Sequence, residues 1–319
     1  MKKSSKNLLL VIFLGIVVCL PFLLDDYWLH VAILTLFYVI MASSWNLLAG
    51  YTGQVSFAHA AFAAIGAYIS GILSVQMSIS PLITLLFGSV IAAIFGLGLG
   101  LLCLKMGGIY LSLTTLGFSE IVHIIIKNEY EITRGTMGLE VPNLLGFYSK
   151  TAYFYIMLSI TFIIIFFLAK LIKSDLGLKF KSVLNDELAA SSIGIDTVKV
   201  RVIAFTISSA IAGFAGGLYG HYLLLITPEM SSLSQMFMIL AMTIIGGMGT
   251  LSGPIAGAVF LQVLSEYIRI FGKFHLLLFG VISLLVIKFA PGGIVGLYRK
   301  ITQSKTDLLK IETQSKYDY

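Results

Sequence analysis

Few side chains in this sequence could move a proton or hold a metal ion, and most of them lie inside long apolar stretches. Glu120 and His123 are three residues apart, so they share one face of a helix. Such a pair can form half of a metal site in a helical bundle, but the chain has no second Glu-x-x-His copy. We expect a local hydrogen-bonded pair at these residues, with no metal, no resident cofactor and no enzyme activity.

The composition indicates whether these residues lie in water or in a lipid bilayer. Hydrophobic residues make up 58% of the 319 residues and charged residues 11%, whereas a soluble domain is usually about a quarter charged. Apolar stretches long enough for a helix to cross a hydrocarbon core about 30 Å thick recur along the chain. We predict an all-α membrane protein with about ten transmembrane helices and glycine-interrupted elements. These helices are expected near residues 7–24, 29–48, 57–76, 81–104, 107–126, 152–172, 202–225, 231–248, 254–270 and 274–290.

Lys and Arg residues are distributed unequally between the two sides that this topology defines. With the N-terminus inside, most of the 21 cations fall on the inner side, where such residues gather in membrane proteins. We therefore predict cytoplasmic N- and C-termini, one transmembrane domain over residues 1–300 and a cytoplasmic tail over residues 301–319. The loop at about 127–151 is then external and the loop at about 173–201 internal. The same bias explains the net charge of +6 without nucleic acid.

Residues 49–56 interrupt an apolar stretch with small and polar side chains. The interruption supplies Gly50, Thr52, Gly53, Gln54 and Ser56, and His59 follows three residues later. Irregular backbone at membrane depth is tolerated only where protein covers it or where it lines a watery cavity. Two interpretations stay open: a short cytoplasmic turn before a tightly packed helix, or a broken element beside a translocation pathway. His59 is likewise either a packing residue or a titrating gate.

A faint internal repeat reuses this pattern near the end of the chain. The spacing G-x2-G-x2-S-x3-A begins at Gly50 and again at Gly246, and six predicted spans separate the copies, so they would point the same way across the membrane. Paired glycine-interrupted helices point to a transporter's binding site or gate, although chance similarity among small residues is the alternative. Thr114 and Thr115 either bond to their own helix or face the pathway. The pathway candidates are Gly50, Gly53, Gln54, Ser56, His59, Thr114, Thr115, Gly246, Gly249 and Ser252.

The internal loop contains a short capped helix. Asn185 can serve as its N-cap, Asp186 and Glu187 suit the first turn, and Gly194 can end it. A helix of about two turns is not stable alone in water, so it needs a surface on which to dock. The surface is either a groove on a partner protein or anionic lipid. The chain has no G-x-x-x-x-G-K-[ST] phosphate loop, so ATP must be bound by a separate subunit.

Several stretches together resemble the LivM-type permeases, the membrane subunits of bacterial ABC importers for branched-chain amino acids. They are "WNLLAGYTGQVSFAHAAFAAIGAY" at 45–68, "GGIYLSLTTLGFSEIV" at 107–122, "AASSIGID" at 189–196, "AFTISSAIAGFAGGLYG" at 204–220 and "IIGGMGTLSGPIAGA" at 244–258. The resemblance implies a plasma-membrane permease that pairs with a homologous LivH-like permease, two ATP-binding subunits and an external solute-binding protein. It also implies that Glu187, Ala189, Ala190 and Gly194 form the loop that couples to the ATPase, with Glu187 one position early relative to the usual acid.

Two departures from the family pattern lie toward the external face. The external loop usually reads Thr-Gly-Gly-x-x-Gly, but here Arg134 replaces a glycine, and His123 stands where the family often has arginine. The candidates for contact with the binding protein are Thr133, Arg134, Gly135 and Gly138. Two other functions stay open: a related importer for urea or amides, or an ion-coupled carrier with Glu120 or Glu266 as the proton site.

Overall fold

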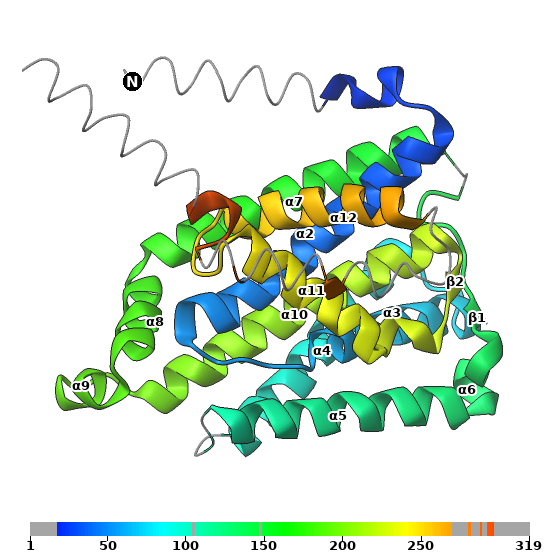
Figure 1. Cartoon of the computed structure of the whole chain (residues 1–319). Helices are drawn as coiled ribbons and strands as arrows, with labels where there is room; N and C mark the ends of the chain where they lie inside the picture. The colour runs from blue at the N-terminus through cyan, green and yellow to red at the C-terminus, as the bar shows by residue number, and fades with distance from the viewer. Residues whose placement is uncertain are drawn as a thin grey trace, which may run out of the picture.

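Apolar helices form nearly all of the described part of the chain (Figure 1). The computed structural model describes residues 18–103, 106, 108–146, 149–269, 280–281, 288 and 292–296. Most of the predicted spans at 7–24 and 274–290, and the whole predicted tail at 301–319, lie outside these residues.

Six helices in this part are long and apolar enough to cross a membrane. They are α2 (Asp26–Thr52), α3 (His59–Gln76), α4 (Pro81–Leu102), α5 (Ile109–Asn128), α7 (Lys150–Lys173) and α10 (Thr197–Leu223). The shorter helices are α6 (Tyr130–Thr133), α8 (Asp175–Asn185), α9 (Glu187–Ser192), α11 (Leu233–Gly246) and α12 (Gly253–Ile268). The remaining elements are the 3-10 turns η1 (Gly135–Met137) and η2 (Pro228–Ser231) and the strands β1 (Leu139–Glu140) and β2 (Leu225–Ile226).

Two predicted spans, at 231–248 and 254–270, contain helices shorter than the six long ones. They correspond to α11 and α12, which have 14 and 16 residues. At a rise of 1.5 Å per residue these helices are about 21 and 24 Å long, less than a bilayer core of about 30 Å. The predicted span is longer than α11 because η2 ends at Ser231 and Ser232 caps the helix, and Gly247, with φ of 121°, follows its last residue.

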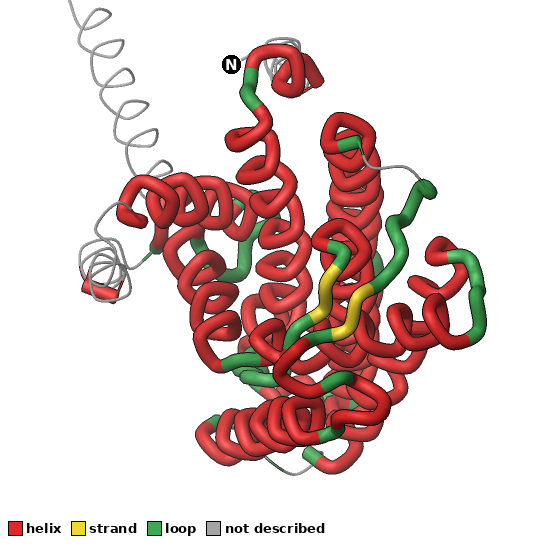
Figure 2. The backbone as a smooth tube through the Cα atoms, turned by 90° about the vertical axis from the view of Figure 1, so that its right-hand side faces the viewer, coloured by secondary structure: helices red, strands yellow, loops and turns green. Residues whose placement is uncertain are grey.

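The helices surround a central group formed by α2, α3 and α10. Helix α4 packs against α3 and α10, α7 and α12 pack against α2, and α5 lies outermost beside α3 (Figure 1). Helices α8 and α9 project at one end of the bundle, called the α9 end below. The opposite end carries α6 and the antiparallel pair β1–β2, in which Leu139 faces Ile226; it is called the strand end and faces the viewer in Figure 2.

Backbone contact between glycines holds α3, α4 and α10 together. A Cβ at Gly66 would overlap the carbonyl oxygen of Gly213 in α10, and a Cβ at Gly88 in α4 would overlap the carbonyl oxygen of Gly66. Small residues allow membrane helices to approach this closely, and dispersion contacts then stabilise the pair. Ala60 and Ala64, at helical spacing on α3, are buried in the same way.

Gly66→Ala is expected to lower the free energy of unfolding by about 1–3 kcal/mol, because its methyl group must displace the backbone of α10. Thermal unfolding of the purified protein in detergent measures the change. Gly98→Ala in α4 is the matched control, since no atom lies within 4 Å of its Cβ position. Equal unfolding temperatures for the two variants would contradict the close-packing argument.

Candidate functional site

The two copies of the sequence repeat meet at the α9 end of the bundle. Gly53 ends α2 with φ of 73°, and Gly249 lies in the turn between α11 and α12 with φ of 76°. Both positions require the left-handed backbone that glycine adopts without strain. A Cβ at Gly50 would lie 2.6 Å from the backbone N of Gly249, so the copies touch directly. We call residues 53–58 and 247–252 together the junction.

Helices α2 and α11, which precede the two halves of the junction, run side by side in the same direction. Tyr38 OH donates to Gln235 Oε1 (2.8 Å), and Thr243 Oγ1 donates to the carbonyl of Ala42 (3.2 Å). The residue numbers rise together on both helices, which confirms the predicted parallel relation of the copies.

Asn46 of α2 clamps the second half of the junction to the helix that precedes the first half. Its Oδ1 accepts from the N–H of Gly249 (2.8 Å) and its Nδ2 donates to the carbonyl of Thr250 (2.9 Å). The side chain is buried, and Gly50, one helical turn later, leaves room for it, because a Cβ there would overlap Asn46 Oδ1. The sequence analysis missed Asn46, since its partners lie about 200 residues away.

The segment at 53–58 is held in an extended form by side chains of α2 and α5. Trp45 Nε1 donates to the carbonyl of Ser56 (2.8 Å), and Thr115 Oγ1 accepts from the N–H of Phe57 (2.9 Å). Gln54 is buried and accepts from Thr52 (3.4 Å). Of the two threonine candidates, Thr115 therefore belongs to the junction.

The other threonine candidate and the second half of the junction make local bonds. Thr114 donates to the carbonyl of Tyr110 in its own helix (2.9 Å). Thr250 Oγ1 donates to the carbonyl of Gly247 (2.8 Å) and accepts from the N–H of Gly253 (3.0 Å), which shapes the turn. Gly246 is buried against Gly253, whereas Ser252 is exposed at the start of α12 and makes no side-chain cap.

His59 lies in the packed interior at the start of α3. Its Nε2 contacts Ser208 Oγ, which itself donates to the carbonyl of Ser44 (2.7 Å), so the imidazole must supply the proton of the shared contact. The ring is fully buried. This chain of bonds joins α3, α10 and α2 and favours the packing interpretation of His59 over the gating one.

The capped helix of the internal loop is present as α9, with one correction. Its N-cap is Asp186 rather than Asn185, because Asn185 is the last residue of α8; Asp186 Oδ1 accepts from the N–H of Ala189 (3.0 Å). Gly194 follows the helix with φ of 85°. Ala190 is buried, while Ala189 is exposed.

Glu187 makes its bond inside this chain, in an ion pair with Arg201 of α10. Leu188 in α9 is 81% exposed and Ile193, just beyond the helix, 75% exposed, with exposed Ser191 and Ser192 between them. Helix α8 in turn contacts the junction, since Leu184 Cδ1 lies 3.2 Å from the Cβ position of Gly53. Beside it, a groove of about 390 Å³ runs between Lys181 of α8 and the turn at 249–252. The segment formed by α8 and α9 therefore packs against the junction.

At the strand end, the four external-loop candidates divide into buried and exposed residues. Thr133, Gly135 and Gly138 are buried, and Thr133 Oγ1 donates to the carbonyl of Ile126 (2.7 Å). Arg134 is exposed with φ of 59°, the left-handed backbone that the glycine usual in the family would adopt freely. Only Arg134 of the four presents its side chain outward.

A polar network at the strand end ties the external loop to the helices. His221 Nδ1 bonds to the carbonyl of Pro142 (2.7 Å) and its Nε2 to Ser70 Oγ (2.9 Å), while Tyr153 OH donates to the carbonyl of His221 (3.0 Å). The sequence analysis gave no role to these residues, whose partners come from four different segments.

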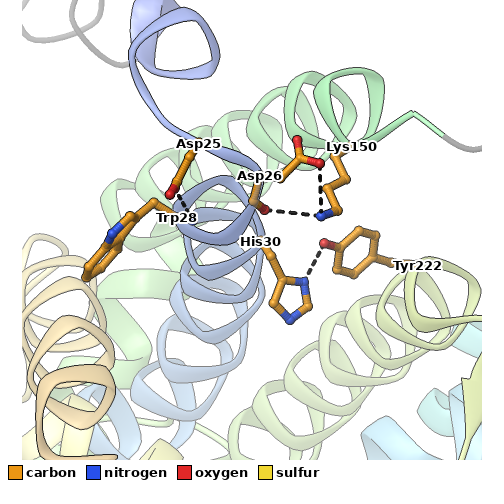
Figure 3. Close-up of polar contacts among 6 residues, drawn as sticks. All are labelled: Asp25, Asp26, Trp28, His30, Lys150 and Tyr222. Atoms are coloured by element: carbon orange, nitrogen blue, oxygen red, sulfur yellow. Dashed lines mark hydrogen bonds and ion pairs between the residues drawn. The ribbon is translucent and has the colours of Figure 1, made fainter. Parts of the chain in front are cut away.

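The start of α2 is tied down in the same region (Figure 3). Lys150 Nζ lies 3.6 Å from Asp26 Oδ2 and also donates to the Asp26 carbonyl (3.2 Å). His30 Nδ1 lies 2.6 Å from Tyr222 OH of α10. These contacts fix α2 against α7 and α10.

His123 does not pair with Glu120, contrary to the sequence-based expectation. Its Nδ1 lies 3.1 Å from the Pro228 carbonyl and 3.0 Å from Ser231 Oγ, both in η2. Glu120 shares a helix face with His123, but η2 packs against α5 and its oxygen atoms contact the imidazole instead.

Over residues 27–290 the chain matches a protein family described as "Branched-chain amino acid transport system / permease component". The high-affinity branched-chain amino acid transport system permease protein LivM of Escherichia coli (strain K12) is 29% identical, over 97% of this chain and 79% of that protein. LivM of Salmonella typhimurium is 28% identical over the same shares. A probable LivH permease of Methanocaldococcus jannaschii is 26% identical over 81% of this chain and 88% of its own length. No solved structure matches.

Asn46→Ala is expected to lower the free energy of unfolding by about 2–4 kcal/mol, because it leaves the Gly249 N–H and the Thr250 carbonyl without their partner. Hydrogen exchange should also become faster at Gly249. Thermal unfolding and exchange mass spectrometry measure both effects. Asn185→Ala, at an exposed position, is the control; unchanged exchange at the turn in Asn46→Ala would refute the clamp.

Arg134→Gly is expected to raise the free energy of unfolding by about 0.5–1 kcal/mol, because glycine removes the left-handed strain at this position. The apparent melting temperature in detergent is the measurement. Met137→Gly, an exposed substitution in the neighbouring turn where φ is not positive, should not stabilise the protein. A lower melting temperature for Arg134→Gly would show that the arginine side chain contributes more than its backbone costs.

Proposed function

The chain belongs to the family of permease components of branched-chain amino acid transport systems, and we propose that it is the permease of an ABC importer for leucine, isoleucine or valine. Its relatives named above are branched-chain amino acid permeases, which supports the substrate class. Its partners in this proposal are a LivH-like second permease, two ATP-binding subunits and an external solute-binding protein. The complex lies in the bacterial plasma membrane.

The distribution of cations supports a cytoplasmic position for the α9 end. The described cations near that end are Lys170, Lys173, Lys179, Lys181, Lys199 and Arg201, whereas those near the strand end are Lys127, Arg134, Lys150 and Arg269. Cytoplasmic segments of membrane proteins carry the excess of Lys and Arg. The strand end, with Arg134 on its surface, then faces the delivering protein.

The observation that carries the proposal is the geometry of α9. A helix of 6 residues is not stable alone in water, yet Leu188 in it and Ile193 directly after it are large apolar side chains that stay exposed. Glu187 and Ala190 hold the helix to the rest of the chain and leave the face that carries Leu188 for a partner. An ATPase groove would cover this face and move α8 against the junction as ATP is bound and hydrolysed. Anionic lipid is the alternative surface for the same helix.

An ion-coupled carrier could use Glu120 or Glu266 as its proton site; Glu120 has no hydrogen bond or ion pair with the described residues and stays open for that role, whereas Glu266 is paired. In an ion-coupled carrier, Glu266 would have to release its proton during transport. Glu266 instead accepts from Arg269 Nη1 (2.9 Å) and also bonds to Tyr27, so its carboxylate is committed to a local cluster. A urea or amide importer shares the same architecture and differs only in the solute delivered.

Leu188→Asp is expected to lower ATP-dependent leucine uptake at least about tenfold, because a charge in place of this apolar side chain disfavours burial against a partner. Uptake of labelled leucine is measured in vesicles that contain the permease pair, the ATPases and the binding protein. Co-purification of the ATPase subunit should fall in parallel. Asn185→Asp adds the same charge just before α9 and should leave uptake unchanged.

Three outcomes would contradict the proposal. Normal uptake and normal ATPase co-purification with Leu188→Asp would remove α9 from the coupling role. Wild-type uptake that needs no ATPase and follows a proton gradient would exclude an importer and favour the carrier. ATP-dependent uptake of urea instead of leucine would transfer the assignment to the amide importers.

A further inference from the structure

One flank of α5 carries a row of residues that runs along nearly the whole helix. The helix buries the face that contains Leu111, Thr115, Ser119, Val122 and Ile126. Beside this face, at spacings of three and four residues, lie Ile109, Ser112, Leu116, Glu120 and His123. Residues at these spacings stand one above another on a helix, so the row forms a continuous strip from the α9 end toward the strand end.

The half of the strip near the α9 end borders a groove of about 460 Å³. One wall contains Ile109, Ser112 and Leu116 from the strip, and the other contains Val55 and Phe57 from the junction. The lining is mainly apolar, and the hydroxyl of Ser112 donates a hydrogen bond to the carbonyl of Val55 (3.0 Å). The groove therefore suits an aliphatic group rather than a polar one.

Glu120 stands one turn beyond Leu116 on the same strip, near the middle of α5. It is partly buried and makes no hydrogen bond or ion pair with any residue that the structure describes. His123 is not available as a partner because η2 holds it. A carboxylate at membrane depth is costly unless it is paired or faces water, which makes an unpaired one a functional candidate.

The surroundings of the strip differ from a lipid-facing surface. Gly53 and Val55 are exposed in the irregular segment beside it, and such backbone meets either water or protein rather than lipid wherever it enters the membrane. The outward face of α7 presents mainly large apolar side chains, among them Phe162, Ile163 and Phe166, and its polar residues there include Ser159 and, near the end of the helix, Lys170. The flank of α5 that carries Glu120 therefore faces either a watery passage or another protein chain.

We propose that this flank of α5 is a substrate subsite in the passage, where the groove takes the aliphatic side chain of an amino acid and Glu120 pairs with its α-ammonium group. The proposal rests on the proposed function and extends it to particular residues. One helical turn separates Leu116 from Glu120, about 5–6 Å between Cβ atoms, which is comparable with the length of leucine. The second permease closes the open side of the groove and binds the α-carboxylate.

Glu120→Gln tests the ammonium contact in the complete importer, reconstituted in proteoliposomes with leucine-loaded binding protein. Leucine uptake is expected to fall about tenfold or more, because a charged hydrogen bond to the substrate is lost. ATP hydrolysis stimulated by the loaded binding protein should stay near the wild-type rate, since the substitution lies away from α9. Ile121→Gln places the same amide one residue away on the exposed side of α5 and should leave both rates unchanged.

Leu116→Trp tests the apolar groove independently. The tryptophan ring would shorten the groove, and leucine is one methylene longer than valine. The substitution should therefore lower leucine uptake more than valine uptake, by about threefold in the ratio of the two rates. Val90→Trp on the exposed face of α4 is the matched control and should not change the ratio.

The outcomes separate this proposal from the one on which it rests. If the wild-type complex shows no ATP-dependent uptake of a branched-chain amino acid, the proposed function fails. If the wild type transports leucine but Glu120→Gln does so equally well, the subsite alone is overturned. Equal losses of uptake and ATP hydrolysis in Glu120→Gln would also overturn it, because they indicate a structural or coupling role. A leucine-to-valine ratio unchanged by Leu116→Trp would remove the groove from the site.

Discussion

Backbone contact between α3, α4 and α10 is the constraint on which the other contacts depend. Inside a bilayer there is no hydrophobic drive to bring apolar helices together, so close fit and interhelical bonds must do so. Gly66, Gly88 and Gly213 provide the fit, because any Cβ at Gly66 or Gly88 would enter the neighbouring backbone. Once these helices are in contact, Ser208 of α10 reaches both His59 and the carbonyl of Ser44 in α2. The position of α2, and with it the junction, follows from that packing.

Helix α10 connects the two ends of the molecule. Its 27 residues extend over about 40 Å. Near its start Arg201 holds Glu187 of α9, and near its end His221 holds Pro142 of the external loop and Ser70 of α3. A displacement of α9 therefore acts on a rigid element that reaches the strand end. Helix α8 provides a shorter route, because Leu184 lies against Gly53 in the junction itself.

The two departures from the family pattern have local structural explanations. Arg134 occupies a left-handed position at the end of α6, so it replaces a glycine at a cost in backbone strain while it presents a cation outward. His123 uses its ring nitrogen to hold η2 at the flank of α5. Both residues lie toward the strand end. Their backbone conformation and contacts shape that end and do not decide whether the chain folds as a permease.

The sequence by itself determined the features that depend on composition and on residues close together in the chain. These are the membrane class, the six long helices, the interruption after α2, and the short capped helix α9, whose cap was misplaced by one residue. Local backbone preferences and hydropathy act within a few residues, so they can be read directly. The tertiary structure decided which polar groups meet. Asn46 finds Gly249, Glu187 finds Arg201 and His123 finds η2 because helix packing brings distant segments together. The same packing leaves Glu120 without a partner among the described residues, and nothing in its immediate sequence distinguishes that carboxylate from a paired one.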